Sequence, residues 1–270
     1  MNASEPLPEF ERPPVNEVAF GMLTEPVEGL LVPHFGRYWA SVAAEFPRCE
    51  EAPPVLPLVE LFGETASTVN LELGDGLPLP RVWLLSETGN NLIQLQRDRL
   101  LFNWRRMHPG DEYPRYPSVR AGFGRALDSF QAFLASCALK PARPLQYELT
   151  YINHIELEEG PLAEQVHAVL RDYHWDTERR LLSEADQFNS ALGFLMPGNI
   201  GRLHAVARNA MHRETRRPVL LLELTARGMP ETPSESAMWE WFDMTHEWIV
   251  RGFADLTEPE IQRAVWGRTT

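Results

Sequence analysis

The first residues that could carry out recognition chemistry lie between positions 103 and 116, where guanidinium groups and aromatic rings are close in sequence. The group comprises Asn103, Trp104, Arg105, Arg106, Tyr113 and Tyr116. Arginine beside aromatic rings is suited to stacking on a base and holding a phosphate. A structural interpretation stays open, in which Trp104 extends an apolar core face and the arginines pair with Asp111 and Glu112.

A second group lies in the segment LTYINHIEL, which reads as a strand. Tyr151 and Asn153 fall on one face of that strand and His154 on the other, because strand side chains alternate. An unsatisfied buried amide costs about 1 to 3 kcal/mol, so Asn153 is expected to make a specific polar contact. That contact either orients a ligand in a pocket or ties a loop or bulge in place.

Trp239 is the third candidate, in the tryptophan-rich helix expected at 234–253. It falls off the apolar stripe through Met238, Trp241 and Phe242. Aromatic side chains outside a core often mark protein interfaces. Trp239 is therefore a candidate contact residue for a protein partner or for a second copy of the chain.

Signatures of common enzymes and metal sites are absent from the sequence. There is no GxGxxG, GxxxxGK[ST], GxSxG or HExxH motif, and Cys49 and Cys137 form no metal-ligand pair. His246, near Asp243 and Glu247 on the last predicted helix, could act as an acid or base in a cleft, but such a residue usually has a structural role. No catalytic residue, metal or cofactor is predicted.

Hydrophobic periodicity indicates the elements that position these residues. The clearest signal is a hairpin with arms at 92–96 and 99–104, in which Leu100, Phe102 and Trp104 share the core face. Other strands are expected at 15–22 and 145–155 and in the long segments 178–195, 200–212 and 219–227. A meander is expected between 58 and 91, after a proline-rich loop at 49–57. Helices are expected at 34–46, at 118–137 with Ser118 as N-cap, at 162–170 and at 234–253.

These elements predict an α+β fold in which antiparallel sheet packs against long amphipathic helices. Residues 1–14 read as an extended lead-in, 15–140 as an N-terminal half and 141–270 as a C-terminal half. Each half is a set of strands followed by one long helix, which suggests two structurally similar halves. They could be two units side by side or one continuous sheet with two helices on one face.

Charge and composition limit the classes of partner that the protein is expected to bind. The chain carries 38 acidic and 25 basic residues, a net charge of -13, so nucleic acid is not an expected partner. Only residues 97–125, with seven arginines, could attract an anion. No apolar run approaches the length of a membrane span and the first residues do not resemble a signal peptide. A cytoplasmic protein that does not associate with membranes is expected.

Four short motifs occur in order along the chain: PPVNEVAF, the NW of residues 103–104, the YP pairs at 113 and 116, and the Y-I-N of 151–153. Together they resemble a sporadically distributed family of uncharacterised bacterial proteins of about this length, which start with a P-x-x-EV-x-F strand. The resemblance covers nearly the whole chain. The resemblance implies a common fold but brings no activity or site residue. The patchy distribution of such a family is compatible with mobile or defence-associated genes.

Two functional hypotheses follow. The first is a non-catalytic module that binds a protein partner or itself, because no catalytic set converges and Trp239 lies off the core stripe. The second is a pocket for a small ligand or nucleotide between sheet and helices, lined by residues such as Trp104, Tyr151 and Asn153.

Overall fold

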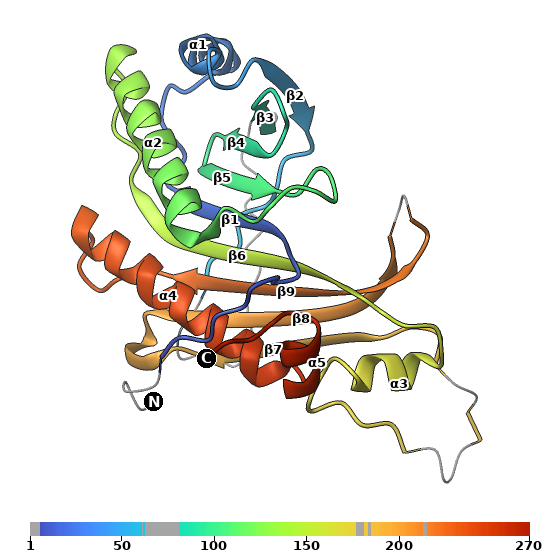
Figure 1. Cartoon of the computed structure of the whole chain (residues 1–270). Coiled ribbons are helices and arrows are strands. Elements are labelled where there is room, and N and C mark those ends of the chain that lie inside the picture. Colours follow the sequence, from blue (N-terminus) through green and yellow to red (C-terminus); the bar gives the residue numbers. More distant parts are fainter. Residues whose placement is uncertain (1–5, 61, 63–80, 177–180, 183–184, 213–214) are drawn as a thin grey trace.

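Alternating apolar residues build one continuous antiparallel sheet of nine strands, which runs through the computed structural model (Figure 1). The structure describes residues 6–60, 62, 81–176, 181–182, 185–212 and 215–270. The strand order is β2-β3-β4-β5-β1-β6-β9-β8-β7. The protein is therefore α+β, and of the two predicted arrangements the single sheet is the one observed.

The strands are β1 (Val15–Thr24), β2 (Arg48–Ala52), β3 (Arg81–Leu85), β4 (Asn91–Gln96), β5 (Arg99–Arg105), β6 (Pro144–Glu156), β7 (Asn189–Leu195), β8 (Gly201–Met211) and β9 (Pro218–Gly228). The helices are α1 (Val32–Val42), α2 (Arg115–Ser136), α3 (Leu162–His167), α4 (Glu235–Leu256) and α5 (Pro259–Ala264), with a 3-10 turn at Pro197–Asn199. In the described part of the chain, the strands before residue 140 form one side of the sheet, and those after it form the other. The two sides join where β1 pairs with β6.

Phe20 marks the centre of the core on the helix-covered face of the sheet. It lies opposite Phe102 of β5 and Leu149 of β6 in the strand register. Its ring centroid is 5.6 Å from that of Phe123 in α2 and 5.0 Å from that of Phe242 in α4. Both 22-residue helices therefore pack on the same face over this strand, as Figure 1 shows.

Four local predictions need correction or fall at least partly outside the described residues. The segment predicted as a loop at 49–57 begins with β2, because its prolines follow the strand and an edge strand needs only one paired side. Helix α2 begins at Arg115, so Ser118 lies inside it and is not its N-cap. Much of the predicted meander, 61 and 63–80, and part of the segment 178–195, lie outside the described residues.

The last predicted helix, 234–253, is observed as α4, which begins at Glu235. Ser234 is the N-cap of α4, and its hydroxyl accepts a hydrogen bond from the Ala237 backbone N–H at 3.1 Å. This bond satisfies one of the free N–H groups of the first turn. None of the helices that the structure describes is long and apolar enough to cross a bilayer.

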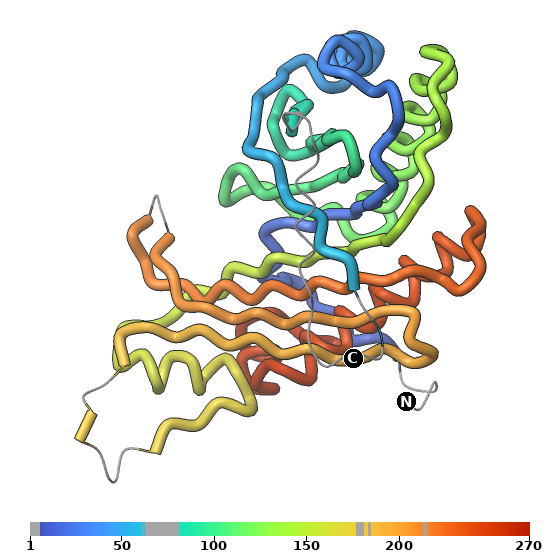
Figure 2. The backbone as a smooth tube through the Cα atoms, turned by 180° about the vertical axis from the view of Figure 1, so that it is seen from behind, coloured from blue at the N-terminus to red at the C-terminus, as the bar shows by residue number. Residues whose placement is uncertain are grey.

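The tube view shows the N-terminal and C-terminal segments close together (Figure 2). Phe10 forms an isolated antiparallel bridge with Arg268. The Glu11 N–H donates to the Gly267 carbonyl at 3.2 Å, and the Thr269 N–H donates to the Glu9 carbonyl at 3.0 Å. The predicted lead-in is thus held against the end of the described chain, and it forms one wall of the site below.

Candidate functional site

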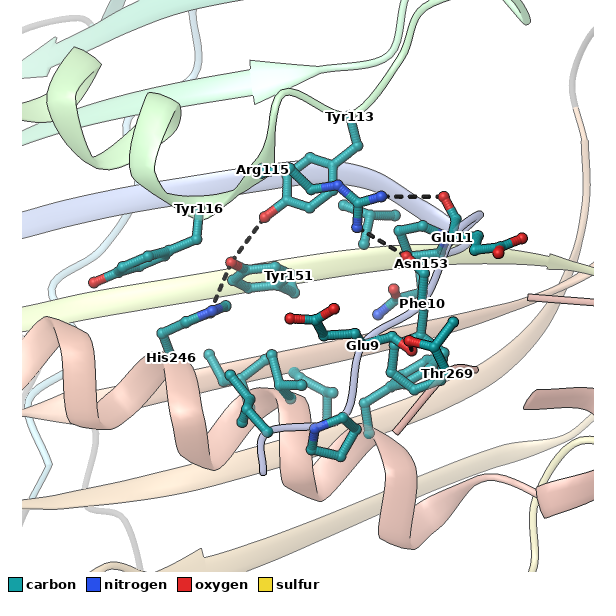
Figure 3. A pocket seen from close by; sticks show the side chains of 18 of the residues that line it. Glu9, Phe10, Glu11, Tyr113, Arg115, Tyr116, Tyr151, Asn153, His246 and Thr269 are labelled. Atoms are coloured by element: carbon teal, nitrogen blue, oxygen red, sulfur yellow. Dashed lines mark hydrogen bonds between the residues drawn. The ribbon is translucent and has the colours of Figure 1, made fainter. Parts of the chain in front are cut away.

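Several predicted residues line one cavity of about 580 Å³ between α4, β6 and residues 7–13 (Figure 3). They are Tyr113, Tyr116, Tyr151 and Asn153. Tyr113 precedes α2 and Tyr116 lies in its first turn, whereas Tyr151 and Asn153 share the helix-covered face of β6. The cavity therefore gathers side chains from both halves of the chain.

Asn103 and Arg105 lie on the opposite face of the sheet from this cavity. The Gln94 amide Nε2 donates to Asn103 Oδ1 at 2.8 Å, and Asn103 Nδ2 donates in turn to Glu17. The Arg105 guanidinium lies 5.6 Å from the centroid of the Trp83 ring. The first predicted group is thus divided between two faces, because neighbouring strand residues point in opposite directions.

Trp104 and Arg106 lie outside the cavity lining. Trp104 is buried, with its ring centroid 5.5 Å from that of Tyr113, so it supports a lining residue from behind. Arg106 Nε is buried and has no hydrogen-bond partner among the described residues. Asp111 accepts hydrogen bonds from Asn90 Nδ2 and from backbone N–H groups, so its predicted pairing with the arginines is wrong.

Trp239 is half-buried on α4, away from the cavity. Its ring contacts Phe123 edge-on at a centroid distance of 6.1 Å, and the Arg120 guanidinium lies 4.2 Å from its centroid. A cation over the face of an indole is a favourable contact. The Trp239 ring, which suggested an interface with a partner, is therefore partly covered by contacts within the chain.

A chain of hydrogen bonds crosses one side of the cavity. The phenol oxygens of Tyr113 and Tyr151 are 3.0 Å apart, and the Tyr151 oxygen is 3.0 Å from His246 Nδ1 (Figure 3). The His246 ring also stacks on Tyr116 with centroids 3.9 Å apart and planes 5° apart. The imidazole is thus fixed by one hydrogen bond and one aromatic face.

Burial controls the protonation of this chain. It lowers the pKa of His246 to about 4, although Asp243 and Glu247 act in the opposite direction. Burial also raises the pKa of Tyr113 to about 12 and that of Tyr151 well above its usual value. Near neutral pH all three side chains are uncharged, so the cavity presents hydrogen-bonding groups without a positive imidazole.

The hydroxyl group of Tyr116 is also held in place. Its hydroxyl donates to Asp243 Oδ1 at 2.7 Å, and Arg120 Nε donates to the same oxygen at 3.1 Å. Burial, followed by the hydrogen bond to Asp243, raises the pKa of the Tyr116 phenol. Tyr116 is therefore a neutral, fixed aromatic wall beneath His246.

Asn153 supplies the buried polar group of the cavity. It is 2% exposed, and its Nδ2 donates to the Leu222 carbonyl at 3.0 Å. Its Oδ1 accepts no hydrogen bond from the part of the chain that the structure describes, although Asn153 lines the cavity. This oxygen is not one of the fully buried side-chain atoms that lack a partner, so it is open to the cavity and can accept a hydrogen bond from a bound molecule.

The N-terminal wall of the cavity is fastened by Arg115. Its guanidinium donates to the Phe10 carbonyl at 2.9 Å and to the Glu11 carbonyl at 3.1 Å (Figure 3). Arg115 has a φ of 68°, a left-handed conformation that is unfavourable for a residue with a side chain. The contacts with residues 10 and 11 hold it there, which links the wall to the start of α2.

Sequence reasoning did not identify Glu9, Phe10 or His246 as site residues. His246 was recognisable as a histidine among carboxylates, but its hydrogen-bond partner, Tyr151, is far away in sequence. Residues 9 and 10 carried no signal, since the lead-in has no periodicity. Among the described residues, no three His, Cys, Asp or Glu side chains are placed to hold a metal ion.

No protein family model matches the chain, and no curated protein is similar to it in sequence.

Proposed function

We propose that the protein binds a small, largely apolar organic molecule in the cavity between α4, β6 and residues 7–13. The observation that carries the proposal is the Asn153 oxygen, which has no partner among the described residues and lies open at the wall of a cavity of about 580 Å³. Ligand sites are usually cavities of about 300 to 1,000 Å³ with mostly apolar walls and a few placed polar groups. Tyr151 and His246 supply further polar groups.

Binding fits the cavity better than proton-transfer catalysis does. A general acid or base works best with a pKa near the working pH. The pKa of His246 is lowered to about 4 and that of Tyr113 is raised to about 12, so both are poorly matched to neutral conditions. The hydrogen-bonded chain is better suited to holding the shape and polarity of the wall.

A neutral fluorescent probe, N-phenyl-1-naphthylamine, tests the proposal directly. Val250 lines the cavity, so Val250→Trp should fill part of it and weaken probe binding at least tenfold. Val265 is 53% exposed and lies outside the cavity lining, and Val265→Trp is the matched control, expected to bind like the wild type. A cooperative transition on chemical unfolding shows that each variant is folded. Equal binding by the two variants, or no binding by the wild type, would refute the pocket.

Self-association through β7 is a second candidate, and it carries forward the protein-interaction hypothesis. The two edges of the sheet differ: β2 carries Glu50 and Glu51, whereas β7 has no charged residue. Leu192 and Phe194 on β7 are 46% and 39% exposed. An uncharged apolar edge strand can pair with the same strand of a second copy around a two-fold axis.

Light scattering during size-exclusion chromatography tests this second candidate. The wild type is expected to elute as a dimer and Leu192→Lys as a monomer, because lysine on an edge strand opposes pairing. Met211 is 54% exposed at the end of β8, and Met211→Lys should leave the dimer intact. A monomeric wild type would end the proposal.

The order of elements supports the proposal of two structurally similar halves. In each half a central strand, β1 or β6, is followed by a short helix and then by an edge strand, β2 or β7. Consecutive antiparallel strands lead back to the central strand, and a long helix, α2 or α4, follows. The proposed ligand cavity then lies near the β1–β6 pairing, where the two halves meet, and side chains of both halves line it.

A further inference from the structure

The charged groups around the cavity do not face it equally. Figure 3 shows the Glu9 carboxylate turned inward toward Tyr151 and His246, whereas the Glu11 carboxylate points away. A side-chain oxygen of Glu11 lies close to Gly267. Glu9 has no ion-pair partner in the described part of the chain, although the Arg115 guanidinium is on the same wall.

Arg115 keeps its positive charge, but the fork that would hold an anion with two parallel hydrogen bonds is turned toward the main chain. Its two terminal nitrogens donate to two main-chain carbonyls. His246 adds no positive charge, since its pKa is lowered to about 4. An anionic ligand would thus meet the Glu9 carboxylate, whereas the terminal nitrogens of Arg115 are directed at main-chain carbonyls, in a chain whose net charge is -13.

The groups that do face the cavity favour a positive charge. Glu9 offers a carboxylate and Asn153 an amide oxygen that lacks a partner among the described residues. The rings of Phe10, Tyr113 and Tyr151 form part of the wall. A carboxylate strengthens a hydrogen bond from an ammonium group, and aromatic faces attract cations.

We infer that the ligand of the proposed pocket is a small organic cation, an ammonium group on an apolar body. The inference rests on the proposed function and specifies its ligand class. The ammonium group donates to the Glu9 carboxylate and the Asn153 oxygen, and the apolar body packs against the aromatic and aliphatic walls. The inward carboxylate of Glu9 thus favours an ammonium over a carboxylate or phosphate as the head group.

Three ligands of similar size separate charge from shape: 2-phenylethylammonium, 2-phenylethanol and 3-phenylpropanoate. Isothermal titration calorimetry at pH 7 with the wild type should give at least tenfold tighter binding for the ammonium than for the alcohol, and the weakest binding for the carboxylate. Glu9→Gln should weaken ammonium binding about tenfold and leave alcohol binding within twofold. Glu11 also lines the cavity, but its carboxylate points away from it, so Glu11→Gln removes the same charge without removing a carboxylate that faces the ligand and should leave both within twofold.

The outcomes distinguish this inference from the pocket itself. Equal or tighter binding of the alcohol or the carboxylate refutes the preference for a cation, as does an equal effect of Glu9→Gln and Glu11→Gln. Failure of all three ligands to bind also refutes it, even where N-phenyl-1-naphthylamine still binds to the wild type. Failure of that neutral probe to bind contradicts the pocket as a whole.

Discussion

Gly228→Ala is expected to lower the free energy of unfolding by about 3 kcal/mol, toward the upper end of the costs of overpacking. A Cβ at this position would overlap the main-chain carbonyl of Ile200. Backbone atoms cannot rotate aside as a side chain can, so β8 and β9 must separate where Gly201 faces Gly228. The loss exceeds the stabilisation of about 0.4 to 1 kcal/mol that alanine gives through the unfolded chain.

Gly193→Ala is the matched control for this prediction. Gly193 is also a strand glycine, but a Cβ there would meet only Arg202 Cδ at an ordinary 3.5 Å. Urea unfolding of the three proteins should show a large loss for Gly228→Ala and a change within about 0.5 kcal/mol for Gly193→Ala. Similar stabilities for the two variants would mean that the β8–β9 approach is looser than described.

Gly228→Ala should also alter the cavity, through the hydrogen bond between Trp241 and Ile200. The indole N–H of Trp241 donates to the Ile200 carbonyl at 2.8 Å and so fastens α4 to the turn between β7 and β8. Displacement of that carbonyl shifts the helix that carries His246. Weaker binding of the neutral probe by Gly228→Ala is therefore expected even under conditions where the variant is fully folded.

The second large effect is a loss of stability on acidification, caused by His246. Its pKa is lowered from 6.5 to about 4 in the folded protein, so between these values the unfolded chain binds more protons. The stabilisation is complete above pH 6.5 and is lost as the pH falls toward 4. This group alone should reduce the free energy of unfolding by about 2 kcal/mol between pH 7.5 and pH 5.

His246→Gln isolates this contribution. The variant should be less stable than the wild type at pH 7.5, because Tyr151 loses its native partner. Between pH 7.5 and pH 5, however, its free energy of unfolding should fall by about 2 kcal/mol less than that of the wild type. The carboxylates nearest His246, namely Asp243, Glu247 and Glu9, remain in both proteins. Exposed His108, replaced by glutamine, is the control, and the wild-type dependence on pH should persist. An unchanged dependence in His246→Gln would show that this imidazole is accessible to protons in the folded state.

Much of the strand layout follows from local alternation. Leu100, Phe102 and Trp104 share a buried face as predicted, because period-two patterning decides which side of a strand meets the core. The same rule placed Asn153 beside Tyr151. Alternation cannot, however, tell which strands pair, and the meeting of β1 with both β5 and β6 depends on contacts distant in sequence.

The candidate site was harder to predict for the same physical reason. Tyr151 and His246 meet only because β6 and α4 pack together, and they are 95 positions apart. The Glu9 wall is held by hydrogen bonds to the other end of the described chain, which no local pattern encodes. Proximity in sequence was also misleading, since Asn103 and Arg105 point away from Tyr113 across the sheet.

The wall that joins Glu9 to Thr270 has a consequence for biosynthesis. The Glu9 N–H donates to the Thr270 hydroxyl across 261 positions of sequence. At translation rates of about 5 to 20 residues per second, the segment around Glu9 waits roughly 13 to 50 s for Thr270 to be added. A nascent chain on the ribosome can thus form β1 to β5 long before the wall that carries Glu9 is in place, so binding of the proposed ligand would come late in the maturation of each molecule.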